Sequence, residues 1–279
     1  MIEKILIPTD GSGYSKTALE YGIYVAKRLG AQVTGLHVVD IRLIQGPVFT
    51  DISGSIGLPP YQEFLPSIRS GLDEKAEGIL EAFRARCEEA GFQPETLKSM
   101  GLIDETIIDE GKQADLIVLA RRGEHFHLTG GGILGSTAES VVRKSGKPVM
   151  VTPETFLEIE SMGLAYDGSM PAENALELAV KLSDAASWPL TIIVITDDHE
   201  LEANIIRKLD DFLEPLKIDS ETIILRGKED REIIKFIKEG SIELMVMGAY
   251  GHNRLRELIL GSTTSHVIRK STVPVLLTR

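Results

Sequence analysis

Short apolar runs alternate along the whole chain with segments whose apolar residues have helical spacing. In the first half, apolar runs typical of buried parallel strands fall at 5–8, 33–38, 97–100, 116–120 and 148–152. The segments 15–29 and 72–87 instead place apolar residues three and four positions apart, which predicts helices buried along one face. Strands that alternate with helices predict an α/β fold, with a parallel sheet covered by helices on both faces.

The same pattern occurs twice, so we expect a duplicated domain. Asp10-Gly11-Ser12 recurs as Asp167-Gly168-Ser169. Three later segments also recur in order, namely 115–120 as 243–248, 134–137 as 260–263 and 147–149 as 273–275. The predicted domains are residues 1–153 and 154–279, each with a five-stranded sheet that binds ligands at the carboxyl ends of its strands. Segment 41–70, rich in Gly, Pro and Ser, is predicted to be a long loop present only in the first domain.

Composition narrows the classes of function. The chain has 30 basic and 42 acidic side chains and a net charge of −12, which argues against binding to nucleic acid or to anionic membranes. No run is long and apolar enough for a transmembrane helix, and the first residues lead directly into a strand without a signal-peptide pattern. The single cysteine, Cys87, lies on a helical apolar stripe and is expected to be a core residue. These features predict a cytoplasmic protein without membrane insertion.

The fourth strand of the second half leads into a candidate phosphate-binding loop. Gly248 and Gly251 follow the strand, and nine residues later Gly261-Ser262-Thr263 begins a helix. Glycines allow close approach of a ligand to the backbone, and the amides of a helix N-terminus attract an anion. This arrangement requires no net basic charge. Spacing alone leaves open that the two glycines make a turn and that Ser262 only caps the helix.

Gly-x2-Gly-x9-Gly-Ser after the fourth strand, together with an Asp that closes the first strand, resembles the universal stress protein family. The resemblance covers nearly the whole chain as two tandem copies. It implies Rossmann-like domains of the adenine nucleotide α-hydrolase type, packed as a pseudo-dimer with the final strands, 148–152 and 274–278, at the seam. It also implies a homodimer of tandem chains.

The resemblance further implies where a nucleotide binds. In ATP-binding members of the family, the strand-one Asp and a main-chain group at the end of strand two hold adenine, and the glycine loop and the next helix hold ribose and phosphates. In the second copy the matching positions are Ala165, Asp167, Ile195, Gly248, Gly251, His252, Arg254, Gly261, Ser262 and Thr263. Ala165 replaces the usual Pro and Ile195 the usual Val, and both changes are expected to be mild.

The first copy departs further from the family pattern. Its matching positions are Asp10, Val38, Gly123, Gly135, Ser136 and Thr137. Ala120 replaces the first glycine, Arg121 and Arg122 follow it, and eleven residues instead of nine separate Gly123 from Gly135. Bulky side chains here would either block ribose or bind phosphates in place of amides. We therefore expect an altered or degenerate site.

Three functions remain open from the sequence. The first is a stress-response regulatory protein that binds ATP or AMP, with or without Mg²⁺, mainly in the second domain. The second is a slow ATPase or adenylyl-transfer enzyme, for which His252 is the one plausible general base in the loop; no catalytic residue is assigned. The third is a nucleotide-free interaction protein that docks through 41–70. His125 and His127 lack a third ligand nearby, so no metal site is assigned.

Overall fold

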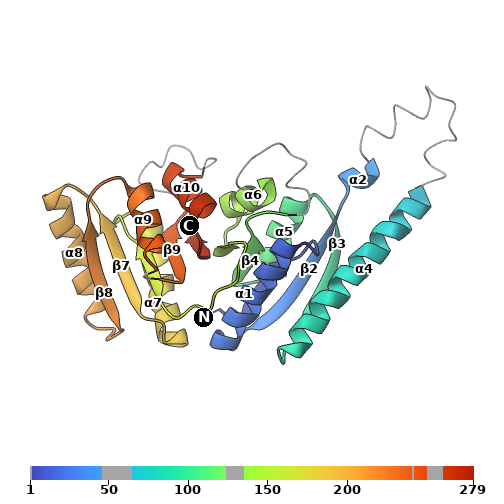
Figure 1. Ribbon diagram of the computed structural model, residues 1–279, viewed down its shortest axis with the longest axis horizontal. Coiled ribbons are helices and arrows are strands. Elements are labelled where there is room, and N and C mark those ends of the chain that lie inside the picture. The colour runs from blue at the N-terminus through green and yellow to red at the C-terminus, as the bar shows by residue number, and fades with distance from the viewer. Residues whose placement is uncertain (1, 46–64, 124–134, 241, 250–259) are drawn as a thin grey trace, which may run out of the picture.

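The computed structural model describes residues 2–45, 65–123, 135–240, 242–249 and 260–279. The first half runs through β1 (Lys4–Pro8), α1 (Gly13–Leu29), β2 (Gln32–Asp40), α2 (Arg42–Gln45), α4 (Leu65–Glu89), β3 (Glu95–Gly101), α5 (Ile103–Gly111), β4 (Leu116–Ala120), α6 (Ser136–Lys144) and β5 (Val149–Thr152). The second half runs through β6 (Met162–Ala165), α7 (Met170–Ala186), β7 (Leu190–Ile195), α8 (His199–Leu213), β8 (Ser220–Leu225), α9 (Glu229–Lys238), β9 (Leu244–Gly248), α10 (Ser262–Lys270) and β10 (Val275–Thr278) (Figure 1). Strands and helices therefore alternate in both halves, as the sequence predicts.

The described strands form one continuous sheet in the order β3-β2-β1-β4-β5-β10-β9-β6-β7-β8. Each half has the same internal order, and its neighbouring strands are parallel. The two halves meet where β5 pairs antiparallel with β10, with Val151 opposite Val275 and Val149 opposite Leu277. The predicted fold class and the predicted seam are both confirmed.

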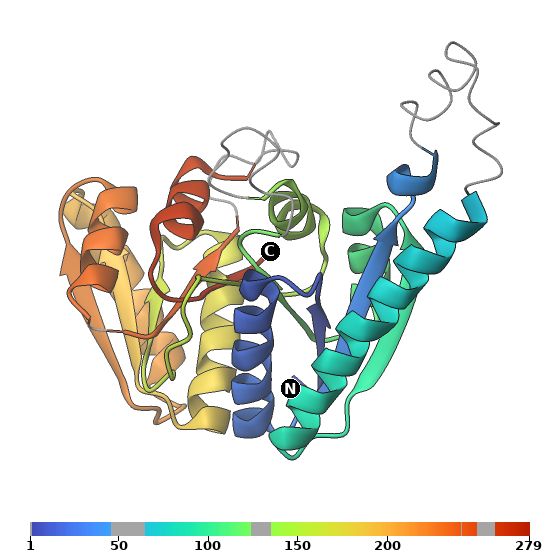
Figure 2. The ribbon, with the colours of Figure 1, turned by 45° about the vertical axis from the view of Figure 1, so that its right-hand side comes forward.

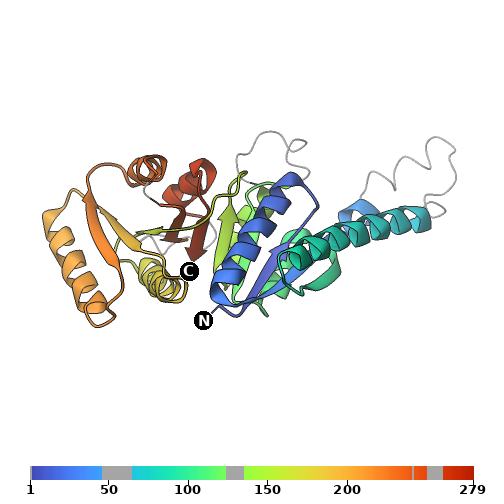
Figure 3. The same cartoon turned by 60° about the horizontal axis from the view of Figure 1, so that its bottom comes forward.

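Two apolar layers cover the sheet. Alternate residues of the strands face opposite layers: Ile5 of β1 belongs to the layer that α1, α4, α7 and α8 cover, and Leu6 belongs to the layer that α5, α6, α9 and α10 cover. In Figure 3, α9 and α10 lie across the sheet from α7 and α8. Helices α1 and α7 contact each other beside the seam (Figure 2). The core therefore continues from one half to the other on both faces.

Serine caps begin the first helix of each half. Ser12 accepts a hydrogen bond from the Ser15 amide, and Ser169 accepts one from the Ala172 amide, with Pro171 in the first turn. Cys87 is fully buried, in agreement with its expected core position.

The prediction of a loop over 41–70 is wrong at both ends of this segment. Residues 42–45 form the short helix α2, and α4 begins at Leu65 instead of at 72. Pro66 in the first turn of α4 is compatible with a helix, because that amide has no intrahelical partner. The abundance of Gly, Pro and Ser in the whole insertion hid this start. The remainder of the predicted loop lies outside the described residues.

The segment between β5 and β6 is packed against α1. The Tyr21 hydroxyl donates to the Thr155 carbonyl (3.2 Å) and accepts from the Leu157 amide (3.0 Å). The Phe156 ring contacts Tyr21 edge-on at 4.8 Å between centroids, and Tyr24 donates to the Ile159 carbonyl. Burial raises the pKa of the Tyr21 hydroxyl to about 12. The halves are thus joined by a packed connection, within which the proposed domain division at 153/154 falls.

We predict that Tyr21→Phe lowers the free energy of unfolding by about 1–3 kcal/mol, because it leaves the Leu157 amide without its partner. Chemical denaturation measures this change. Tyr166→Phe is the control, since this buried tyrosine has no hydroxyl hydrogen bond among the described residues. Equal stability of Tyr21→Phe and the wild type would contradict the prediction.

From the raised pKa of the Tyr21 hydroxyl we predict that the folded chain loses stability at high pH. Because the pKa of Tyr21 is about 12 in the folded chain against 10.0 for free tyrosine, the unfolded chain loses this proton first as the pH rises. Its contribution to stability is complete below pH 10 and falls between pH 10 and 12. Urea titrations across this range should therefore show a steeper decline for the wild type than for Tyr21→Phe.

Candidate functional site

A cavity of about 340 Å³ lies at the carboxyl ends of β1, β2 and β4 in the first half. The six residues predicted for the first site all line it: Asp10, Val38, Gly123, Gly135, Ser136 and Thr137. They come from three strand ends and the start of α6, which the parallel topology brings to one edge of the sheet. The sequence pattern and the structure thus select the same place in the first half.

The cavity also has walls that sequence reasoning missed. Its lining includes Leu43 of α2 and Leu72 and Lys75 of α4. Ile103 and Ile107 of α5 complete the apolar part. The spacing of Leu72 had marked a buried helix face, but it gave no indication that this face also borders a cavity. The insertion of the first half therefore contributes directly to the shape of its cavity.

A tight turn after β1 fixes the Asp10 carboxylate. The Ser12 amide donates to Asp10 Oδ1 at 3.0 Å, and Gly11 between them has φ of +79°, which favours glycine. A Cβ atom at Gly123 would lie 3.0 Å from Asp10 Oδ2. The glycine at 123 therefore leaves room for the aspartate side chain, in addition to any room it leaves for a ligand.

The N-terminus of α6 supplies the amides of the cavity. Gly135 precedes the helix and has no side chain that could cap it, and its own amide donates to the Arg121 carbonyl (2.9 Å). Ser136 and Thr137 then open the helix on the cavity side. Arg143 and Lys144 occupy the last turn of the helix. This distribution of charge and amides favours an anion at the N-terminal end.

Arg121 and Arg122 both line the cavity, but their guanidinium groups bind protein atoms. Arg121 Nη1 donates to the carbonyl oxygens of Ile268, Arg269 and Ser271, each at 3.1 Å. Arg122 forms an ion pair with Glu154 at 2.7 Å. Burial, and then the neighbouring Arg122, lower the pKa of Arg121. In this structure Arg121 is directed away from the strand ends and toward α10.

The second half repeats the turn after its first strand. The Ser169 amide donates to Asp167 Oδ1 at 2.9 Å, Gly168 has φ of +75°, and Ala165 ends β6. Gly261 precedes α10, whose first residues are Ser262 and Thr263. The described parts of the second site thus match the first in backbone geometry. Gly251, His252 and Arg254 lie outside the described residues.

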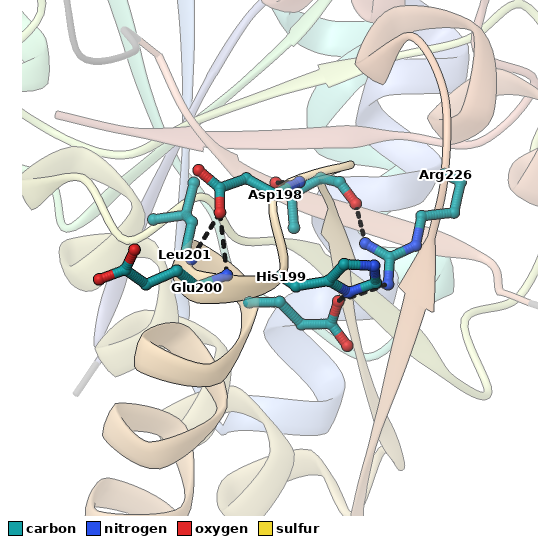
Figure 4. Close-up of polar contacts among 7 residues, drawn as sticks. Asp198, His199, Glu200, Leu201 and Arg226 are labelled. Carbon is teal, nitrogen blue, oxygen red and sulfur yellow. Dashed lines mark hydrogen bonds and ion pairs between the residues drawn. The ribbon is translucent and has the colours of Figure 1, made fainter.

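Polar contacts hold the end of β7 next to Ile195, whose main chain is the predicted adenine contact. Arg226, which follows β8, donates to the carbonyl of Thr196 and to the Glu202 carboxylate. Asp198 caps α8 by accepting from two amides of its first turn, at 2.9 and 3.1 Å (Figure 4). These contacts fix the chain directly after Ile195, so this acidic segment has a structural role.

Among the described residues, no three His, Cys, Asp or Glu side chains lie close enough together to hold a metal ion. His125 and His127, which the sequence leaves without a third ligand, fall outside that part of the chain. No helix of the described part has the length and apolarity needed to cross a membrane.

Comparison with known proteins identifies the fold and the repeat. A sequence profile of the universal stress protein family matches residues 1–153 and 196–279. This chain belongs to that family. Universal stress protein Slr1230 from Synechocystis sp. is 31% identical over 286 aligned residues that cover 99% of each chain. The crystal structure of a universal stress protein from Archaeoglobus fulgidus has a TM-score of 0.78 at 25% identity, and the match covers 99% of this chain and 96% of that one.

The first glycine of the universal stress protein loop has a packing role in the second half. A Cβ atom at Gly248 would lie 2.9 Å from Pro171 Cβ and 3.0 Å from its carbonyl carbon, in the first turn of α7. The loop pattern predicts this glycine as a ligand contact, and the structure shows in addition that the missing side chain lets strand β9 approach α7. By contrast, a Cβ atom at Gly261 would meet Thr264 Oγ1 at an ordinary 3.5 Å.

We predict that alanine lowers the stability of the protein at Gly248 but leaves it nearly unchanged at Gly261. Gly248→Ala should lower the free energy of unfolding by about 1–3 kcal/mol, because the backbone of α7 must shift. Gly261→Ala is the matched control and should change it by less than about 0.5 kcal/mol. Thermal and urea denaturation of the two variants measure the difference. Equal stability of both would show that α7 adjusts without cost.

Proposed function

We propose that this universal stress protein is a regulatory protein that binds an adenine nucleotide, ATP or AMP, mainly in its second half. One observation carries the proposal. In both halves, an aspartate whose carboxylate accepts from a turn amide follows the first strand. In both halves, a helix with glycine at its N-cap begins after the fourth strand, at the same edge of the sheet. A carboxylate that accepts from an amino group and helix amides that bind phosphate are complementary to the two ends of a nucleotide.

Each group has a defined role in this proposal. Asp167 accepts a hydrogen bond from the exocyclic amine of adenine, and the main chain at Ile195 completes the recognition of the base. The amides and hydroxyls of Ser262 and Thr263 bind phosphate, and Gly261 allows its close approach. Gly248, Gly251, His252 and Arg254 surround ribose and phosphates, with Mg²⁺ as an accompanying ion.

The first half is proposed as a second, altered site. Its cavity volume falls in the range of about 300–1,000 Å³ that is common for small-molecule sites. Asp10 and the start of α6 occupy the same positions as their counterparts in the second half, while α2 and α4 add apolar walls. These walls and the changed loop are expected to give the first site a different affinity from the second.

A regulatory role follows if the bound nucleotide changes the interactions of the protein with partners. A ligand shifts such an equilibrium only by binding the two states with different affinities. The proposal places this regulation in the cytoplasm and in a homodimer of tandem chains. The enzymatic alternative requires a base such as His252 and predicts conversion of ATP on prolonged incubation with Mg²⁺, which a phosphate-release assay detects.

We predict that Asp167→Ala and Gly261→Val each weaken ATP binding in the second half by about ten- to a hundredfold. Each change removes hydrogen bonds to a charged group or blocks amides that form them, worth about 1.5–3 kcal/mol. Isothermal titration calorimetry gives the affinities, and native mass spectrometry gives the number of nucleotides bound per chain. Asp184→Ala, an exposed carboxylate on α7, is the control and should bind as the wild type does.

Wild-type affinity in both variants would contradict the site assignment. If the unaltered protein binds neither ATP nor AMP, the result would contradict nucleotide regulation itself and favour the nucleotide-free interaction protein.

A further inference from the structure

Arg121 is fixed by its backbone at the point where the two halves meet. It directly follows β4, its amide donates to the Thr152 carbonyl at the end of β5 (3.3 Å), and its carbonyl accepts from the Gly135 amide (2.9 Å). The residue thus connects the end of β5 with the N-cap of α6. Its backbone has little freedom to place the side chain elsewhere.

The antiparallel seam brings the end of α10 to this side chain. Because β5 and β10 run in opposite directions, the carboxyl end of β5 lies next to the amino end of β10, with Val151 opposite Val275. Helix α10 ends at Lys270, only a few residues before β10 begins. A residue at the carboxyl end of the first half therefore meets the C-terminus of a helix from the second half.

The contact between Arg121 and α10 supplies hydrogen-bond donors to the end of the helix. The last carbonyl oxygens of a helix have no intrahelical donors and carry partial negative charge. Arg121 Nη1 donates to three such oxygens, those of Ile268, Arg269 and Ser271, at 3.1 Å each, and the Arg121 side chain is only 12% exposed. A buried cation with several donors thus holds the end of α10 through multiple contacts.

The opposite end of α10 is the phosphate-binding end of the proposed second site. The helix has nine residues, so about 13 Å separates its ends, and a helix this short moves as a rigid unit. We propose that Arg121 is a positioning residue for the second-half anion site, holding α10 so that the amides after Gly261 are correctly placed. This inference rests on the proposed function.

Among the described residues, the counterpart of Arg121 in the second half does not repeat its contact. The position that corresponds to Arg121 in the second half is Ala249, whose amide donates to the Thr278 carbonyl in the same way (2.8 Å). Its methyl side chain cannot reach the carbonyl oxygens of α6. Arg121 also lines the first-half cavity, so a ligand there lies beside the residue that holds α10. The first half therefore supports the second site through Arg121, and Ala249 gives no equivalent support in return.

The test compares ATP binding in Arg121→Met, Arg121→Lys and the wild type by titration calorimetry. The wild type and both Arg121 variants are also measured with Gly261→Val added. The binding that disappears when Gly261→Val is added belongs to the second half. Arg86→Met is the matched control, because it removes a guanidinium that pairs with Glu20 on the other face of the sheet. Hydrogen exchange of the α10 amides without nucleotide shows directly how firmly the helix is held.

We expect second-half binding to weaken about tenfold in Arg121→Met, with an intermediate loss in Arg121→Lys, which keeps the charge but not the planar group of donors. Exchange of the α10 amides should be faster in Arg121→Met, while Arg86→Met keeps wild-type affinity. The Arg121→Met change should have no further effect once Gly261→Val is present.

Wild-type second-half affinity in Arg121→Met overturns the positioning role while leaving the proposed function intact, even if α10 exchanges faster. The same loss with and without Gly261→Val also overturns it, because the effect would then belong to the first-half cavity. Absence of ATP binding by the wild type is a separate result, which overturns the proposed function and the positioning role together.

Discussion

The antiparallel pairing of β5 with β10 is the contact on which the rest of the molecule depends. All four residues of β5 are buried, and its hydrogen bonds to β10 turn two five-stranded sheets into one. Without β10, β5 would be an edge strand with a row of unpaired N–H and C=O groups, and its apolar residues would lose part of their cover. The seam thus joins the two halves through a shared sheet in addition to the connecting segment.

The seam also determines which parts of the two halves are neighbours. A parallel pairing would bring together the carboxyl ends of both sets of strands. The antiparallel pairing instead places the carboxyl end of the first half beside the amino end of β10 and the C-terminus of α10. The aromatic contacts of Tyr21 and Phe156 on the other side of the sheet reinforce the same arrangement.

Most of the fold was predictable because its signals are local. Buried strands appear as apolar runs, and the repeated Asp-Gly-Ser turn shows itself as a short motif with a fixed backbone shape. The start of α4 was missed because helix-compatible residues at 65–72 follow a Gly- and Pro-rich stretch. The role of Gly248 was not predictable, because the Pro171 that approaches it is distant in the sequence.

At the candidate site, the partners of Arg121 and Arg122 were likewise not predictable from the sequence. Their position in the loop predicts an altered site in the first half, but the sequence offered only two partners for them, a ribose to block or a phosphate to bind. The partners in the structure are Glu154 and the end of α10, both brought there by the junction and the seam.

Duplication therefore had a consequence that neither copy shows alone. In the joined copies, a residue from the loop of the first copy contacts the second. Arg121 makes such a contact, and Ala249 at the equivalent position does not. The changed loop of the first half therefore has a structural use, because the Arg121 side chain binds the end of the helix that carries the proposed second site.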